Sequence, residues 1–191
     1  MMKKTKTFLL LVFTVCFVSA SCRVVEKVIN PVKKERKEIV KKVYEKSGVS
    51  FLHPDNWQVS EDSTSDEGVR QVTVEDSDNS LFIITLFGLD SYVDLDEYAE
   101  NFKNTLPANI PIGKVRDGSK SEIDRLIKGQ NYTGIRYTYS IYLLNQTVPH
   151  TVDFFSINGE GLNAIVLIQA PDEDWKAAEK EFQVIFDSLK F

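Results

Sequence analysis

The chain contains two histidines, and His53 is the clearest candidate for acid–base chemistry because a carboxylate lies close to it. His53 and Asp55 stand on either side of Pro54, and an aspartate near an imidazole can orient it as a general base. Proline restricts the preceding residue to extended backbone, however, so these two side chains need not face each other. The chain also lacks the G-x-S-x-G motif that positions a nucleophilic serine. We therefore expect a structural role for His53, and we predict a protein that is not an enzyme.

Metal and phosphate sites are equally weak in the sequence. His53 and His150 are too far apart for the close pair spacing of a zinc site. Residues 76–80 begin like a calcium-binding loop, but apolar residues occupy the later positions of its glycine and its bidentate glutamate, which favours a hairpin turn. Residues 113–121, GKVRDGSKS, miss the phosphate-loop pattern because Ser119 follows the second glycine in place of lysine. We expect a flexible loop there, and no metal or cofactor.

Binding chemistry is better represented, in the tyrosine-rich residues 131–143, NYTGIRYTYSIYL. In a strand, alternation places Tyr132, Arg136 and Tyr142 on one face. Tyrosine and arginine are favoured interface anchors, so these three residues are predicted to bind a protein partner if the helices leave that face open. The alternative is that they lie under a helix with their polar groups paired. One basic patch is expected nearby, formed by Lys114, Arg116, Lys120 and Arg125.

Charge divides the 191-residue chain into a basic beginning and an acidic remainder. Residues 23–46 carry nine Lys and Arg against four Glu, whereas residues 47–191 carry eleven basic against twenty-four acidic side chains. Nucleic acid is an unlikely partner for so acidic a domain, because phosphate binding needs a clustered basic face. The apolar fraction of 42% and charged fraction of 27% are ordinary for a packed globular domain.

The N-terminus, MMKKTKTFLLLVFTVCFVSASC, has the pattern of a secretory signal peptide. Lysines precede an apolar-rich run at residues 8–18, and small residues follow at 19–21. A helix needs about 20 apolar residues to span a bilayer, so this run is too short, and a retained membrane-spanning anchor is the weaker alternative. We predict that residues 1–21 are a signal peptide that is removed.

Cys22, directly after the small residues, resembles the lipobox cysteine of bacterial lipoproteins, although Ser19 stands where that family usually has an aliphatic residue. The resemblance implies that Cys22 is lipidated on sulfur, that the chain is cut before it, and that the new amino group is acylated, typically with palmitate. Cys16 would leave with the signal peptide, so Cys22 would be the only cysteine of the mature chain. The predicted location is the bacterial cell envelope, membrane-anchored on the periplasmic side or in the outer membrane. The alternative is an ordinary signal peptide followed by a chance cysteine.

Residues 22–46 are predicted to be the lipidated cysteine and a basic helical tether. Pro31 fits the first turn of a helix, and the apolar residues that follow it fall near one stripe. The lysines around this helix either lie against anionic headgroups or pack on the domain, or the segment is a solvated spacer. The sequence leaves these alternatives open.

Residues 47–191 are predicted to form one α+β domain, an antiparallel sheet of about five to seven strands packed by helices in a layered sandwich. Alternation and β-branched or aromatic content predict strands at residues 69–75, 80–87, 131–143, 148–157 and 161–169. The pattern weakens between residues 107 and 130, where we expect a loop with at most one short strand.

Two amphipathic helices are predicted to cover this sheet. The first begins at Asp94 as N-cap, with Glu97 at the third helical position, and is expected to end at Pro107. The second follows an acidic turn at residues 171–174 and carries an apolar stripe as far as Leu189.

Two short motifs at the ends of this domain resemble the PsbP-like (DcrB-like) family. Residues 51–59, FLHPDNWQV, are similar to the F-x-x-P-x-x-W-x-V opening of these domains, and residues 175–191 are similar to their last helix and its exit. The family implies an antiparallel sheet sandwiched by helices, and members that are mostly adaptors or assembly factors, bacterial lipoproteins among them. The leading hypothesis is thus a non-enzymatic, lipid-anchored adaptor for an envelope protein. The alternative is a carrier of a small or lipidic ligand, which would need an apolar pocket between sheet and helix.

Overall fold

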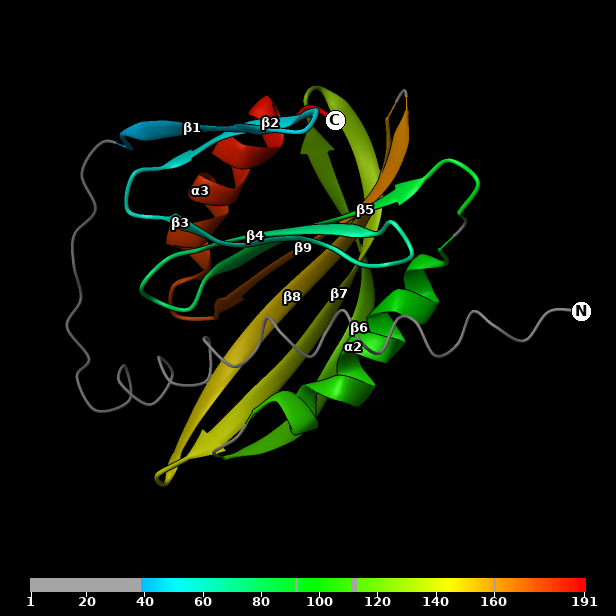
Figure 1. Cartoon of the computed structure of the whole chain (residues 1–191). Coiled ribbons are helices and arrows are strands. Elements are labelled where there is room, and N and C mark those ends of the chain that lie inside the picture. The colour runs from blue at the N-terminus through cyan, green and yellow to red at the C-terminus, as the bar shows by residue number, and fades with distance from the viewer. Residues whose placement is uncertain (1–38, 92, 111–112, 160) are drawn as a thin grey trace, which may run out of the picture.

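The computed structural model describes residues 39–91, 93–110, 113–159 and 161–191. The predicted signal peptide, Cys22 and the tether as far as residue 38 therefore lie outside the described residues. The described chain forms a seven-stranded antiparallel sheet with a helix packed on each face, together with a separate two-stranded hairpin (Figure 1). This architecture confirms the predicted α+β fold class.

The strand order of the sheet is β3-β4-β5-β9-β8-β7-β6, and all neighbours are antiparallel. The strands are β3 (Gln58–Thr64), β4 (Arg70–Glu75), β5 (Leu81–Gly88), β6 (Lys114–Ile127), β7 (Gln130–Leu143), β8 (Gln146–Asn158) and β9 (Leu162–Pro171). Five of them, β4, β5, β7, β8 and β9, lie where alternation predicted strands. The turn between β7 and β8 holds Leu144 and Asn145 at φ angles of 50° and 62°, as the tight hairpin turn that matches strand twist requires.

Strand β6 contradicts the loop expected before residue 130. It is 14 residues long and pairs with β7 along its whole length. Most of its side chains are exposed because it is an edge strand, so it carries no apolar alternation. A bulge lies between Asp117 and Lys120, where Gly118 approaches β7 so closely that an added Cβ would lie 2.4 Å from the Thr138 hydroxyl oxygen. The charges and the bulge protect this edge from pairing with another strand. They also interrupt the alternation by which a strand is predicted from sequence.

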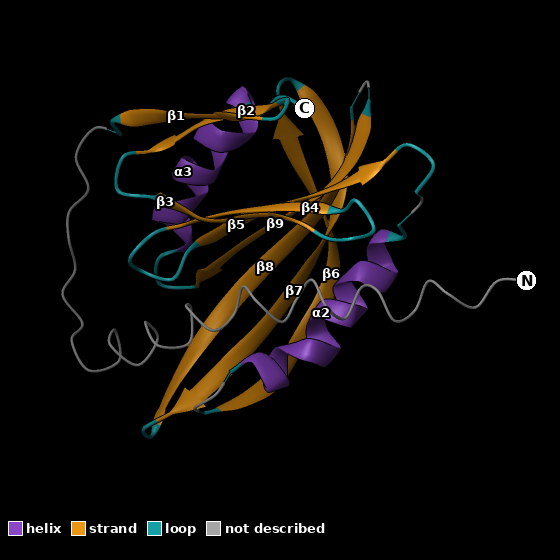
Figure 2. Cartoon of the chain, in the orientation of Figure 1, coloured by secondary structure: helices purple, strands orange, loops and turns teal. Residues whose placement is uncertain are grey.

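The two predicted helices are present (Figure 2). Helix α2 (Leu95–Asn109) begins as predicted, because the Asp94 carboxylate accepts a hydrogen bond of 2.9 Å from the Glu97 backbone amide. Its predicted end is wrong, since Pro107 lies inside the helix. Pro107 stands in the last turn, where a missing amide removes only one hydrogen bond, and the helix ends two residues later. Helix α3 (Trp175–Ser188) is followed by Leu189, whose amide donates to the Ile185 carbonyl.

The core has two layers, one on each face of the sheet. Helix α3 and the hairpin pack on one face, where the Trp57 ring meets Phe182 edge-on at 5.5 Å and Phe82 contacts Phe186 at 4.9 Å. Helix α2 packs on the other face, where Phe102 contacts Phe154 at 5.3 Å. Strand β7 contributes every second residue to the α2 layer, namely Ile135, Tyr137, Tyr139 and Ile141.

Strands β1 (Lys41–Lys46) and β2 (Val49–Pro54) form the antiparallel hairpin. The predicted tether helix is therefore wrong for residues 41–46. Tyr44 stacks on Phe51 of β2 at a ring distance of 4.7 Å, and this tertiary contact outweighs the weak helical stripe. The alternation that turns Tyr44 inward leaves Val43 on the outer side.

A polar cluster around Asp62 of β3 holds the hairpin to the sheet. Asp62 accepts hydrogen bonds of 2.9 Å from Tyr44 and from Arg70, and it forms an ion pair with Lys46. Arg70 also donates to the Lys46 and Ser47 carbonyls at 3.1 Å. Burial alone would raise the pKa of Asp62, but the hydrogen bonds from Arg70, Lys46 and Tyr44 outweigh it and hold the pKa well below its usual range.

We expect this attachment to loosen in acid. Because the folded pKa of Asp62 is lowered, the stabilisation is fully present above its unfolded pKa of about 3.8 and is lost as pH falls toward the lower folded value. Hydrogen exchange should then show that protection of the β1 amides decreases below that pH before protection of β9 does. The Asp62→Asn variant should lose this pH dependence. An unchanged pH profile in that variant would assign the loosening to another group.

Candidate functional site

The three residues predicted to bind a partner lie on one face of β7, as alternation predicted. Tyr132, Arg136 and Tyr142 are each half-buried and alternate with the buried residues of the α2 layer. A strand rises about 3.3 Å per residue, so Tyr132 and Tyr142 are about 33 Å apart. They therefore belong to different surroundings rather than to one site.

Helix α3 covers the first part of this face. Its first residue, Trp175, lies under the Arg136 guanidinium, with the carbon of that group 5.0 Å from the ring centre. Two turns later, the Gln183 amide donates to the Leu126 carbonyl of β6 at 3.2 Å. Tyr132 packs against the core in this covered region, and its hydroxyl donates to Gln130 at 3.3 Å. Tyr132 thus matches the alternative prediction of a tyrosine under a helix with its hydroxyl paired.

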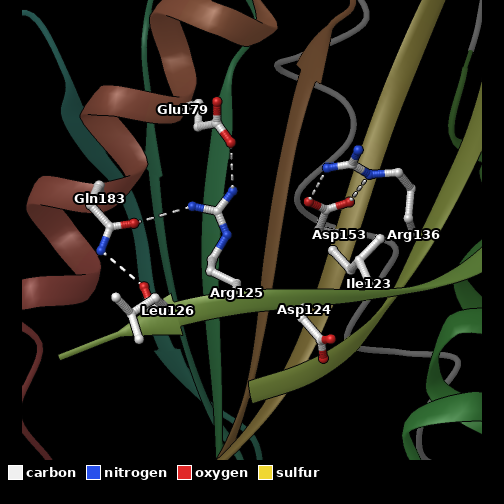
Figure 3. Close-up of a pocket in the computed structure, with 8 residues that line it drawn as sticks. All are labelled: Ile123, Asp124, Arg125, Leu126, Arg136, Asp153, Glu179 and Gln183. Carbon is white, nitrogen blue, oxygen red and sulfur yellow. Dashed lines mark hydrogen bonds and ion pairs between the residues drawn. The ribbon is translucent and has the colours of Figure 1, made fainter. Parts of the chain in front are cut away.

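Arg136 lies in a pocket of about 660 Å³ between α3 and strands β6, β7 and β8 (Figure 3). Its Nε and Nη2 atoms each donate to one oxygen of Asp153 at 2.7 Å, a bidentate pair across β7 and β8. Asp153 is fully buried, with 0% exposure. Burial raises the pKa of Asp153, and the nearby Arg136 opposes that rise only in part.

A second arginine in the same pocket is also paired. Arg125 donates to Gln183 at 3.3 Å and to Glu179 at 3.4 Å (Figure 3). Its guanidinium carbon also lies 5.4 Å from the ring centre of Phe186. Each guanidinium of the pocket therefore already faces a carboxylate, which leaves little positive charge for an anionic ligand. The contacts among the residues that line the pocket therefore attach α3 to the sheet.

Helix α3 begins beside Arg136 and runs away from the β7–β8 turn, so it leaves the same face of the sheet uncovered from Thr138 to that turn (Figure 1). We define the open face as Arg116 of β6, Thr138, Ser140 and Tyr142 of β7, and Thr147 and Pro149 of β8, which lie side by side in register. Arg116 is exposed and its guanidinium carbon stacks 4.9 Å from the Tyr142 ring centre, while the Tyr142 hydroxyl donates to Asn145 at 2.9 Å. Next to it, Leu144 is 61% exposed at the β7–β8 turn.

The single basic patch expected along residues 114–125 is not formed. Lys120 points to α2, where it pairs with Asp96 at 2.7 Å and Glu100 at 3.2 Å. Arg125 and Arg116 lie on the opposite face of the sheet from Lys120, Arg125 under α3 and Arg116 on the open face. The bulge in β6 reverses the alternation between Arg116 and Lys120, which is why the sequence did not show this separation.

Both histidines are buried in strands and lie beside aromatic rings. His53 is buried in β2, 6.2 Å from the Phe51 ring, with its Nδ1 atom 2.9 Å from the Pro54 carbonyl oxygen. His150 is buried and stacks on Tyr139 at 5.0 Å. Within the described ranges, no three His, Cys, Asp or Glu side chains gather in a way that could hold a metal ion.

A second pocket, of about 670 Å³, lies at the beginning of α2 beside β6 and β7. Its lining is mixed, with Asp94, Asp96, Lys120 and Glu122 among apolar residues such as Leu95 and Ile135. Both of these pockets are open and have mixed polar and apolar linings, unlike the enclosed apolar cavity that a lipid carrier needs. In the part of the chain that the structure describes, no helix is long and apolar enough to cross a membrane.

No protein-family model matches this chain, and no curated protein matches it. Solved structures do. Cyanobacterial PsbP (CyanoP) from Synechocystis sp. PCC 6803 is 13% identical, with a TM-score of 0.48 and coverage of 84% of this chain and 98% of that one. LpqN, involved in cell envelope biogenesis of Mycobacterium tuberculosis, is 11% identical, with a TM-score of 0.39 and coverage of 81% and 93%. The Ran-binding protein Mog1p of Saccharomyces cerevisiae is 14% identical, with a TM-score of 0.39 and coverage of 75% and 85%. The likeness concerns the fold alone, and no site residue is carried over from it.

Proposed function

We propose that this protein is a non-enzymatic, lipid-anchored adaptor of the bacterial cell envelope, and that it binds a protein partner through the open face. The observation that carries the proposal is the stack of the exposed Arg116 on the half-buried Tyr142, on a part of the sheet that α3 leaves uncovered. The anchor rests on the sequence, in which Cys22 directly follows a signal-peptide pattern.

The chemistry of the open face favours a protein over other partners. A tyrosine and an arginine, two of the side-chain types most frequent at binding hot spots, lie among hydroxyl side chains and a proline on paired strands, which fix their backbone positions before binding. The residues of the open face line neither of the two pockets described above, whereas small ligands prefer concave sites. The acidic balance of residues 47–191 is unfavourable for nucleic acid.

A carrier of a small or lipidic ligand is less well supported. Such a ligand would occupy space between α3 and the sheet, where the rings of Trp57, Phe82, Phe182 and Phe186 are fully buried and in direct contact. Opening a cavity there would remove core contacts that stabilise the fold. We therefore retain the adaptor as the proposed function.

Capture of crosslinked partners from native membranes tests this proposal. The tagged full chain is expected to recover a defined protein, and the double variant Arg116→Ala, Tyr142→Ala should recover about tenfold less, because central tyrosine and arginine anchors dominate binding energy. The matched control is Lys176→Ala, Lys180→Ala, which removes two exposed side chains of α3. Equal recovery with both double variants, each shown to be folded, would contradict a binding role for the open face.

A further inference from the structure

The outer side of the β1–β2 hairpin exposes apolar and basic side chains together. Val40 is 61% exposed and Val43 is 68% exposed, although strands usually place polar residues on their solvent side. For Val43 the cause is the register, since Tyr44 turns inward to Phe51 and Asp62 and thereby turns Val43 outward. Val40 lies one residue before the strand begins. Lys41 shares the outer face with Val43, whereas Lys42 is on the face of Tyr44 and donates to the Asp55 carbonyl at 2.9 Å. Both lysines are exposed.

The hairpin and the open face lie at opposite ends of β7. Just before β7 begins, the Lys128 side chain donates to the Leu189 carbonyl. Lys190, which follows Leu189, pairs with Ser50 of β2. At the other end, Tyr142 precedes the β7–β8 turn. The 14 residues of β7 span about 45 Å, and Figure 1 shows the hairpin and this turn at opposite ends of the molecule.

We propose that strand β1, with Lys41 and Val43 on its outer face and the exposed Val40 and Lys42 on the other, forms a membrane-docking surface that lies on anionic lipid headgroups. Lysines near an anionic leaflet are attracted to it, and exposed valines can enter the headgroup region beside them. The body of the domain is acidic, so the same leaflet repels it. Charge therefore selects an orientation with the hairpin toward the lipid and the open face directed away from it.

This inference rests on the anchor of the proposed function and adds to it. Seventeen residues separate Cys22 from Val40, and such a segment extends at most about 60 Å. An anchor of that reach keeps the domain near the membrane but leaves its orientation undetermined. Docking of the hairpin would supply the orientation in which a partner can reach Tyr142.

Thiol labelling of the lipidated full chain in vesicles tests the inference. Because Cys22 would be modified, a Val43→Cys variant would carry one reactive thiol, and Leu144→Cys at the distal turn is the matched control with a similarly exposed side chain. In vesicles that contain phosphatidylglycerol, a water-soluble maleimide should label Val43→Cys about fivefold more slowly than Leu144→Cys, which is the factor that one lysine near an anionic surface contributes. In detergent the two rates should be similar. Adding Lys41→Glu and Lys42→Glu to Val43→Cys should abolish the protection.

The outcomes separate the two proposals. Equal labelling of both variants in anionic vesicles would overturn the docking surface and leave the anchor intact. Protection that persists in phosphatidylcholine vesicles and in detergent would also overturn it, since lipid charge would then play no part. Flotation of the wild-type chain with the vesicles is measured first. A chain that does not float has no anchor, which overturns the proposed lipoprotein and this orientation with it.

Discussion

Replacing Arg136 with alanine is expected to lower the free energy of unfolding by about 3 kcal/mol, the lower end of the range for breaking a buried ion pair. The variant would leave the fully buried Asp153 carboxylate without its two 2.7 Å hydrogen bonds. It would also remove the contact with Trp175 at the beginning of α3. We place the effect at the lower end because Arg136 itself is 34% exposed to solvent. Urea denaturation of the wild type and the variant at neutral pH measures the difference.

The pH dependence of this loss identifies its cause. Burial already raises the pKa of Asp153, and removal of Arg136 raises it further, so the carboxyl group should take up a proton as pH falls. The deficit in stability is therefore expected to be smaller at acid pH than at neutral pH. Arg136→Lys is the control, because it keeps the charge but loses the bidentate geometry, and it should fall between the two. A deficit that is the same at every pH would contradict an unpaired Asp153 as its source.

The Cys22→Ala variant is expected to move the protein from the membrane fraction to the soluble fraction. Each buried methylene of an acyl chain contributes about 0.8 kcal/mol, and stable anchoring takes two signals, such as two chains or one chain with a basic segment. Without lipid, the basic residues 23–46 alone should give only weak and salt-sensitive attachment. Fractionation followed by immunoblotting measures the distribution.

Cys16→Ala is the matched control for this prediction. Cys16 lies in the apolar run of the predicted signal peptide, so its replacement should leave the membrane fraction unchanged. Retention of Cys22→Ala in the membrane after a salt wash would contradict the lipid anchor. It would assign the attachment to an uncut signal peptide instead, since attachment through the basic segment would not survive the wash.

Local pattern predicted the interior of the fold well and its edges poorly. Strands β4, β5 and β7 to β9 alternate clearly or are continuously apolar, because they are packed against helices or neighbouring strands. Strand β6 is solvated along most of its length, so its stability comes from pairing with β7, which residues 114–127 do not reveal by themselves. Strand β1 is rich in lysine, and the contact that decides its conformation joins Tyr44 to Phe51 across the hairpin.

The candidate site was predicted in part for the same reason. Alternation placed Tyr132, Arg136 and Tyr142 on one face of a strand, and the structure agrees. How far α3 extends along that face depends on packing between distant segments, so the sequence left open which of these residues would be covered. A signal for the ion pair was present, since Asp153 interrupts an apolar strand and a buried acid needs a partner. Its partner followed only from the register set by the β7–β8 turn.

The lipid anchor at Cys22 is the claim on which both the adaptor and its orientation at the membrane depend. The mass of the amino-terminal peptide of the protein isolated from native membranes tests it most directly. The account predicts a peptide that begins at Cys22 and carries a lipid on the sulfur and an acyl chain on the amino group. A peptide that begins elsewhere, or one with an unmodified Cys22, would contradict it.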